Sequence, residues 1–426
     1  MNPNKTIWIA GANVWNEGKF SETNIAIRNG KITESGGTLL ESESPDTQII
    51  RADGKYLVPG LVDMHVHFRE PGYSYKETIA TGSRAAAKGG FTTVCTMPNL
   101  NPAPDSVENL QKQLDIIRKD AAVNVLPYAT ITQKRMGHEL VDYNVLAPLV
   151  AGFSDDGTGV QDEDVMRKAM EGIAPTGKIL AAHCEVEALL FNGYIHDGEY
   201  ARAHGHRGIC SESEWKEIER DIRLSEETGC RLHVCHISTK ESVALIREAK
   251  ARGVKVTCET GPHYLTFCDE DLQEHGRFKM NPPIRSRADR DALRQGIIDG
   301  TIDVIATDHA PHAENEKSKG LEKSAMGVVG LETAFAAVYT TMVKSGMISI
   351  ERLVKIMTIN ARRILGLPMS AGINPGNNAD LTLLDISAEW TVDPRQFASM
   401  GTATPYDGMT LTGCIAATIH NGEILC

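Results

Sequence analysis

The stretch LVDMHVHF at residues 61–68, followed by Arg69, alternates apolar and polar side chains. Successive side chains of a strand point to opposite faces, so one face of this stretch carries Asp63, His65, His67 and Arg69. The other face is apolar and suits packing against helices. Burying two imidazoles and a guanidinium is costly unless partners compensate, and a metal ion with an anionic ligand would do so. Taken alone, the stretch fits an ordinary alternating edge strand equally well.

Seven more apolar segments follow, each succeeded by a stretch with helical periodicity. Together with 61–68, the expected strands are 91–97, 124–131, 149–154, 179–184, 231–237, 255–260 and 303–308. Strands that alternate with helices imply a parallel sheet, and eight repeats predict an α/β fold with a (β/α)8 TIM barrel. We expect this catalytic barrel to span residues 57–366.

The two ends of the chain have another pattern. Residues 1–56 and 373–426 alternate apolar with polar residues and turn on Asn-Gly or Asp-Gly, which is typical of half-exposed antiparallel strands, and the expected domain comprises 1–56 and 367–426. We therefore expect one small composite β-sandwich domain assembled from both termini, beside the barrel.

Composition excludes other classes of protein. The net charge of −12, from 44 Lys and Arg against 56 Asp and Glu, disfavours nucleic-acid and membrane partners. The chain has no signal-like start and no long apolar run, which indicates a cytoplasmic protein. Most of the nine cysteines lie in apolar runs and are expected to be reduced core thiols. Phosphate-loop, dinucleotide-binding and serine-hydrolase motifs are absent.

Metal-binding side chains recur at the ends of the expected strands. The carboxyl ends of barrel strands converge on one mouth, where active sites are found. After the fourth strand, parity allows only one of Asp155 and Asp156 to point inward, and it does not choose between them. Six donors would face one point, which suits one or two Zn²⁺ ions with an open position for water: His65, His67, Asp156, His183, His236 and Asp308.

Other histidines are weaker candidates for a catalytic or metal-binding role. His233 falls on the opposite strand face from His236 and is expected to be structural. His204 and His206 repeat the H-x-H spacing, but they lie in a Gly-rich polar loop and are not expected to bind metal. His309 and His263 lie near strand ends, where a role beside the metal ligands and a purely structural role are equally compatible with the sequence.

Nine segments resemble those of the class I dihydroorotases, a family of the amidohydrolase superfamily. They extend from about residue 58 to 332 and read PGLVDMHVHFREPG, GGFTTVCTMPN, FSDDGTGVQ, AAHCE, HVCHISTKES, ETGPHYL, KMNPPIR, ATDHAPH and MGVVGLE. The terminal segments also resemble the composite β domain of that superfamily.

The resemblance implies a role for each candidate residue. His65, His67 and Asp308 would hold one zinc ion, and His183 and His236 a second. Asp156 would bridge the two ions, which decides between the neighbouring aspartates. Asp308 would also be the catalytic acid and base. The implied substrate contacts are His67, Arg69, Asn99, Asn281, His312, Met326 and Gly327.

The activity implied is dihydroorotase, the reversible zinc-dependent cyclisation of N-carbamoyl-L-aspartate to (S)-dihydroorotate plus water in de novo pyrimidine biosynthesis. Arg69 suits the substrate carboxylate, because a guanidinium binds that group with two parallel hydrogen bonds. The segment 313–330 is a candidate for closing over substrate. A homodimer and an association with aspartate carbamoyltransferase are compatible with the resemblance.

Two alternative functions remain to be tested. A hydantoinase- or allantoinase-like cyclic amidase is disfavoured by Arg69 and by residues 149–160, which lack the lysine that bridges the metals in many such relatives. An inactive scaffold partner of a carbamoyltransferase would be expected to have lost metal ligands, yet all six positions are filled.

Overall fold

The computed structural model describes residues 6–36, 47–368 and 373–426. Eight short strands in the middle of the chain pair in parallel. They are β6 (Leu61–Val66), β7 (Phe91–Thr96), β8 (Asn124–Pro127), β9 (Gly152–Phe153), β10 (Ile179–Ala182), β13 (Arg231–Val234), β14 (Val256–Thr260) and β15 (Val304–Ile305). Each strand overlaps one of the eight expected segments, and the fold is α/β as the sequence predicts.

These eight strands belong to two sheets. The first contains β6, β7 and β8, and the second has the order β15-β14-β13-β10-β9. Single parallel bridges join the sheets at both edges, from Val66 to His309 and from Ala129 to Phe153. Because every pairing is parallel, the carboxyl ends of all eight strands lie on the same side.

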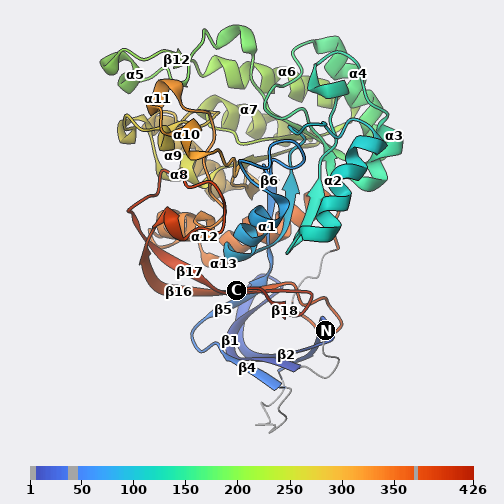
Figure 1. Cartoon of the computed structure of the whole chain (residues 1–426), viewed down its shortest axis with the longest axis vertical. Coiled ribbons are helices and arrows are strands. Elements are labelled where there is room, and N and C mark those ends of the chain that lie inside the picture. The colour runs from blue at the N-terminus through green and yellow to red at the C-terminus, as the bar shows by residue number, and fades with distance from the viewer. Residues whose placement is uncertain (1–5, 37–46, 369–372) are drawn as a thin grey trace.

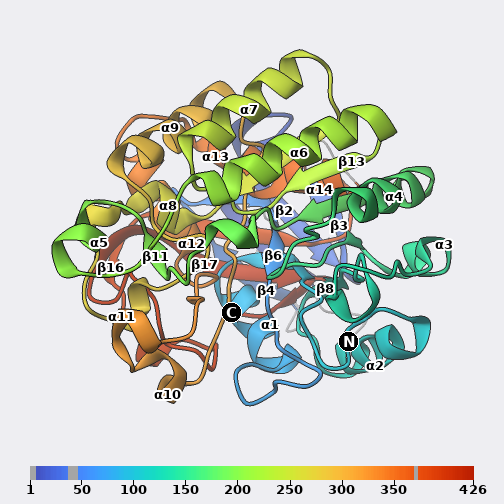
Figure 2. The ribbon, with the colours of Figure 1, turned by 90° about the horizontal axis from the view of Figure 1, so that it is seen from above.

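Helices separate the strands along the chain and surround them in space (Figure 2). The longer helices are α1 (Ile79–Lys88), α2 (Val107–Asp120), α4 (Glu163–Ile173), α6 (Glu212–Thr228), α7 (Lys240–Ala251) and α9 (Arg287–Asp299). Shorter helices include α3 (Tyr143–Leu146), α5 (Glu199–His204), α8 (Pro262–Thr266), α10 (Glu314–Lys317), α11 (Gly320–Lys323), α12 (Ala334–Val338), α13 (Ile350–Val354) and α14 (Asn360–Leu365). Within the described ranges, no helix has the length and apolar character needed to cross a membrane.

Side-chain caps explain where five of the longer helices begin. In each case a Thr, Ser or Asp oxygen accepts a hydrogen bond from a backbone N–H of the first turn, which would otherwise lack a partner. The capping residues are Thr78, Ser106, Asp162, Thr239 and Ser286. Local sequence therefore determines these boundaries.

Seven of the eight parallel strands end earlier than the sequence pattern predicts, and β14 ends at Thr260 as expected. Beyond β6, β13 and β15 the chain leaves the extended conformation, and Arg69, His236 and Asp308 have positive φ angles of 59°, 30° and 48°. Such angles are uncommon for residues other than glycine and are often found at functional sites. Apart from His65, which lies within β6, the side chains expected to bind metal or substrate at these strand ends thus project from the segments that follow the strands.

A separate eight-stranded sheet contains segments from both ends of the described chain, in the order β18-β17-β16-β5-β1-β2-β3, with β4 paired to β1. Its strands are β1 (Thr6–Asn16), β2 (Lys19–Arg28), β3 (Lys31–Ser35), β4 (Thr47–Arg51), β5 (Tyr56–Pro59), β16 (Leu381–Thr391), β17 (Thr410–His420) and β18 (Glu423–Ile424). Figure 1 shows β1, β2, β4 and β5 at the lower end of the molecule, below the helices.

The pairing in this terminal sheet differs in part from the antiparallel arrangement expected. β1 pairs with β4 and β5 in parallel, whereas β1–β2, β5–β16 and β16–β17 are antiparallel. The exception arises because β4 and β5 return to the far side of β1 after a longer connection, and an alternating sequence pattern does not distinguish the two pairings. Within the expected terminal segments, residues 1–5, 37–46 and 369–372 lie outside the described residues.

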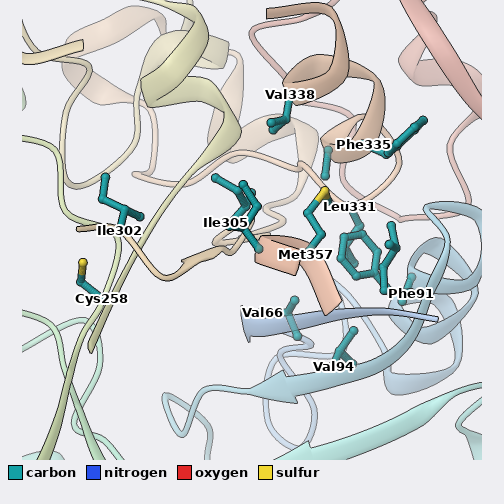
Figure 3. Packing of buried hydrophobic residues seen from close by; sticks show 14 of the residues in the cluster. Val66, Phe91, Val94, Cys258, Ile302, Ile305, Leu331, Phe335, Val338 and Met357 are labelled. Carbon is teal, nitrogen blue, oxygen red and sulfur yellow. The ribbon is translucent and has the colours of Figure 1, made fainter. Parts of the chain in front are cut away.

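The core joins the outward faces of the parallel strands to helices. Figure 3 shows Val66 of β6 and Phe91 of β7 packed near Phe335 of α12, with Leu331 and Met357 between them. Val66 lies between His65 and His67, so its burial on the outer face leaves both imidazoles on the inner face. Packing of the core therefore sets the direction of the ligand side chains.

Replacing Phe91 by Ala should lower the free energy of unfolding by about 3–5 kcal/mol, because it leaves a cavity in this core. Phe191→Ala is the matched control, since Phe191 is 70% exposed and Phe91 only 1%. The control should change stability by less than about 0.5 kcal/mol. Denaturant titration measures both values, and equal losses would contradict the assignment of Phe91 to the core.

Candidate metal centre

The six expected donors converge in one buried cluster at the carboxyl ends of the parallel strands. They come from five different strand ends, and none is more than 7% exposed. Two overlapping groups have their candidate donor atoms within 4.8 Å of one another: His65 with Asp156 and His236, and His65 with His67 and Asp308. His183 joins the first group, since its Nδ1 lies 3.0 Å from His236 Nε2.

Asp156 occupies the centre of the cluster. Its Oδ1 lies 3.3 Å from His65 Nε2, 3.5 Å from His236 Nε2 and 3.6 Å from His183 Nδ1. Its Oδ2 lies 3.5 Å from His67 Nε2. One carboxylate therefore faces the imidazoles of both proposed metal positions, as a bridging ligand would.

Asp155 points away from this centre. Its carboxylate accepts hydrogen bonds from the backbone N–H groups of Ile131, at 2.7 Å, and Thr132, at 3.2 Å, and from the Thr132 hydroxyl. Strand parity did not decide which of the two neighbouring aspartates points inward. In the structure, the backbone amides of the loop after β8 bind the Asp155 carboxylate, and Asp156 is the one that faces the cluster.

The cluster has the properties of a cation site. Three of its buried polar atoms, His65 Nε2, Asp156 Oδ1 and His183 Nε2, have no hydrogen-bond partner among the described residues. Unpaired polar atoms in the interior are costly, and imidazole nitrogens with carboxylate oxygens are the donor set that divalent transition metals prefer. The residues present therefore fit a metal ion.

Glu259 of β14 is a buried contributor that the sequence pattern did not indicate. Its carboxylate accepts hydrogen bonds from His65 Nδ1, at 2.7 Å, and from His233 Nε2, at 3.1 Å. Burial disfavours the charge, but the hydrogen bonds from both histidines bring the pKa of Glu259 below its usual range. With Nδ1 of His65 committed to Glu259, its Nε2 is left for the cluster.

Asp308 lies within hydrogen-bond distance of His67, another expected metal ligand, and stays ionised. Its Oδ1 is 3.0 Å from His67 Nε2 and 3.5 Å from His65 Nε2. Burial opposes ionisation, yet the hydrogen bond from His67 and the nearby charge of His65 lower the pKa of Asp308 to about 2. An unprotonated carboxylate in this position can accept a proton at neutral pH.

The expected carboxylate-binding residues lie beside the cluster. Asn99 Oδ1 is 2.8 Å from His67 Nδ1, and Arg69 donates from Nε to the carbonyl of Pro311 at 3.2 Å. Arg69 is only 9% exposed, and no carboxylate of the described residues lies within 4.0 Å of its guanidinium. A buried cation without an ion-pair partner suits an anionic ligand.

The remaining expected contacts lie in the adjoining loops. His312 Nε2 is 2.8 Å from the carbonyl oxygen of Met326, and a Cβ on Gly327, where φ is 131°, would be 3.1 Å from the same nitrogen. Asn281 joins the cluster indirectly: its Nδ2 donates to Glu185 Oε2 at 3.0 Å, and that oxygen lies 3.5 Å from His183 Nε2. Glu185 is a second contact that the sequence pattern did not indicate.

The other histidines lie outside the donor cluster. His233 is hydrogen-bonded to Thr257 and Glu259, at 2.8 and 3.1 Å. His206 pairs with Glu274 at 2.7 Å near the surface, and His204 stacks on Tyr200. His309 accepts a hydrogen bond from the backbone N–H of Gly330 at 3.2 Å. His263 is buried, and within the described part of the chain its Nε2 has no hydrogen-bond partner.

Two solved structures with a similar fold are a hydantoinase and a dihydropyrimidinase. The L-hydantoinase (dihydropyrimidinase) of Arthrobacter aurescens has a TM-score of 0.87 and 26% identity, over 98% of this chain and 95% of that one. The dihydropyrimidinase of Brevibacillus agri, with a TM-score of 0.85 and 22% identity over 98% and 94%, shows the same fold. The fold and the buried donors define an amidohydrolase.

Comparison with sequences narrows the class. The family model described as Dihydro-orotase-like matches residues 54–242. The dihydroorotase of Fusobacterium nucleatum is 49% identical over 95% of each chain. That of Halalkalibacterium halodurans is 46% identical over 99% of this chain and 98% of its own. The chain belongs to the dihydroorotase family.

Glu259→Gln should weaken metal binding by about 10–100-fold, because the neutral amide no longer fixes the His65 ring as an ionised acceptor does. Competition with a chromogenic chelator measures the affinity directly. Glu248→Gln, on the exposed face of α7, is the control and should bind metal like the parent protein. Equal affinity in the two variants would show that Glu259 does not orient His65.

Proposed function

We propose that this chain is a class I dihydroorotase, which interconverts N-carbamoyl-L-aspartate and (S)-dihydroorotate in de novo pyrimidine biosynthesis. The observation that carries the proposal is the proximity of Arg69 to the donor cluster around Asp156; Arg69 is a buried cation that has no ion-pair partner among the described residues. A cyclic amide with a carboxylate beside its ring satisfies both features. Near-full-length similarity to dihydroorotases at 44–49% identity supports the same activity.

The parallel strands are proposed to form a (β/α)8 barrel over residues 57–366, with a composite β domain built from 1–56 and 367–426. The two bridges that join the parallel sheets at both edges support closure of the barrel. In such a barrel the active site lies at the carboxyl ends of the strands, where the donor cluster is.

Two zinc ions are the proposed cofactors. His65, His67 and Asp308 would hold one, His183 and His236 the other, with Asp156 between them. When bound, such ions lower the pKa of water and polarise a carbonyl group. The unpaired nitrogens of His65 and His183 support this assignment.

Asp308 is the proposed acid and base. In ring opening, water attacks the ring amide carbonyl, Asp308 accepts its proton, and the C–N bond breaks as that proton passes to the departing nitrogen. In cyclisation Asp308 removes a proton from the attacking nitrogen and passes it to the departing hydroxyl group, which leaves as water. Oδ1 of Asp308 lies 3.0 Å from His67 Nε2, so the carboxylate and this imidazole face the same proposed metal position.

Arg69, Asn99 and His312 are proposed to bind the substrate carboxylate, with Asn281 and the backbone of Met326 and Gly327 around the ring. By binding the rest of the substrate, these groups hold the reacting carbonyl in the orientation that the reaction requires. Segment 313–330 supplies the last two residues and is proposed to close over substrate.

A hydantoinase- or allantoinase-like activity is the alternative enzyme. The structural similarity to hydantoinases extends to the fold, but Asp156 lies at the centre of the cluster where a bridging lysine would be needed. An inactive scaffold is disfavoured because all six donors are present. A homodimer, an association with aspartate carbamoyltransferase and a cytoplasmic location stay predictions.

A substrate panel tests the function. Metal-loaded protein should hydrolyse dihydroorotate and cyclise N-carbamoyl-L-aspartate, with at least about 100-fold lower kcat/KM for hydantoin and allantoin, because both lack a matching carboxylate. Metal analysis of the same sample should give two zinc ions per chain. Faster turnover of hydantoin than of dihydroorotate would favour the alternative amidase.

Asp308→Asn should reduce kcat by about 10²–10⁴-fold, since the amide has nearly the same shape but cannot accept the proton. Thermal unfolding and metal content should be recorded on the same preparation, because Asp308 is also a proposed ligand. Loss of turnover with both zinc ions retained supports the acid and base role. Activity above about a tenth of the parent value would assign proton transfer to another group.

A further inference from the structure

Lys76 connects the segment after β6 to the last loop at the mouth of the strands. Its Nζ lies 3.1 Å from His312 Nδ1 and 3.0 Å from Glu316 Oε1 of α10, although Lys76 and His312 are 236 residues apart in sequence. The Lys76 side chain is only 15% exposed. The long Lys76 side chain thus loses rotamer freedom in order to reach one ring nitrogen of His312, a residue proposed to bind substrate.

The contact fixes the protonation of the imidazole. A lysine ammonium can only donate hydrogen bonds, so Nδ1 of His312 must be the acceptor. Burial, together with the charges of Arg69 and Lys76, lowers the pKa of His312 to about 3, so the ring is neutral at neutral pH. Its single proton is therefore on Nε2, which donates to the carbonyl oxygen of Met326 at 2.8 Å.

This tautomer places two donors opposite each other. Arg69 Nη2 lies 3.4 Å from His312 Nε2, and with both nitrogens protonated neither can accept from the other. The Nε2–H is donated to the Met326 carbonyl in this structure, and a substrate carboxylate oxygen that approached Arg69 and His312 would replace that carbonyl as its acceptor and receive two N–H groups. The opposite tautomer would present a lone pair at Nε2, which would repel such an oxygen.

We propose that Lys76 is a positioning residue for recognition of the substrate carboxylate, because it holds His312 in the tautomer that donates from Nε2 beside Arg69. The inference rests on the proposed function and adds a residue that touches no substrate atom. Glu316 completes the arrangement: it pairs with Lys76 and accepts from the backbone N–H of Ala313 at 3.0 Å, so the ammonium is anchored to α10.

Kinetics of the metal-loaded, full-length enzyme test the proposal. Lys76→Met should raise KM for dihydroorotate by at least about 10-fold, as expected for a lost hydrogen bond to a charged group, with kcat within about 3-fold. Lys76→Arg keeps the charge and the donors and should restore most of the affinity. Lys250→Met is the control: Lys250 is 24% exposed and pairs with Asp303 at 2.6 Å, away from the donor cluster.

A spectroscopic measurement separates tautomer control from general stability. In ¹⁵N-histidine-labelled protein, the His312 resonances, assigned by comparison with His312→Gln, should report the Nε2–H form in the parent protein and in Lys76→Arg. Lys76→Met should shift them toward the Nδ1–H form while its thermal midpoint stays near that of Lys250→Met. Both results together would support the proposal.

Three outcomes would overturn it. Lys76→Met could match the Lys250→Met control in KM and in the His312 spectrum, which leaves no role for Lys76 while wild-type turnover upholds the proposed function. A parallel fall of kcat, affinity and thermal midpoint in both Lys76 variants would indicate a merely structural lysine. Absence of dihydroorotate turnover by the wild-type protein would overturn the proposed function and, with it, this inference.

Discussion

The structure depends on the burial of six ionisable side chains around one point. Isolated charges in an apolar interior are strongly unfavourable, so the cluster is stable only if its members compensate one another or share a cation. Asp156 lies at the centre, with imidazole nitrogens of four histidines within 3.6 Å. The surrounding apolar packing keeps these side chains on the inner face, and the turns after the strands direct them inward.

Hydrogen bonds from outside the cluster reduce the freedom of its members. Glu259 fixes His65, and Asn99 contacts the outer nitrogen of His67 at 2.8 Å. The terminal sheet also takes part: Ser399, in the segment between β16 and β17, donates to Glu77 at 2.5 Å, and Glu77 lies 3.6 Å from His309. The residue next to Asp308 is thereby connected to the C-terminal part of the chain.

Much of the fold could be predicted from periodicity, because alternating and helical patterns are local. All eight parallel strands overlap the predicted apolar segments, but seven of them end earlier, and the backbone turns at His236 and Asp308 were not predicted. The parallel pairing of β1 with β4 was missed as well. An alternating pattern specifies which face is buried and leaves the direction of the partner strand open.

The sequence by itself determined which residues could meet, because histidines and aspartates recur at strand ends that a parallel arrangement must bring together. It did not indicate Glu259 or Lys76, since a single glutamate in a strand or a single lysine in a loop has no distinctive pattern. Only the tertiary structure joins Glu259 to His65 and Lys76 to His312, across 194 and 236 residues. Hydrogen bonds require approach to about 3 Å, and that distance is decided by how the whole chain packs.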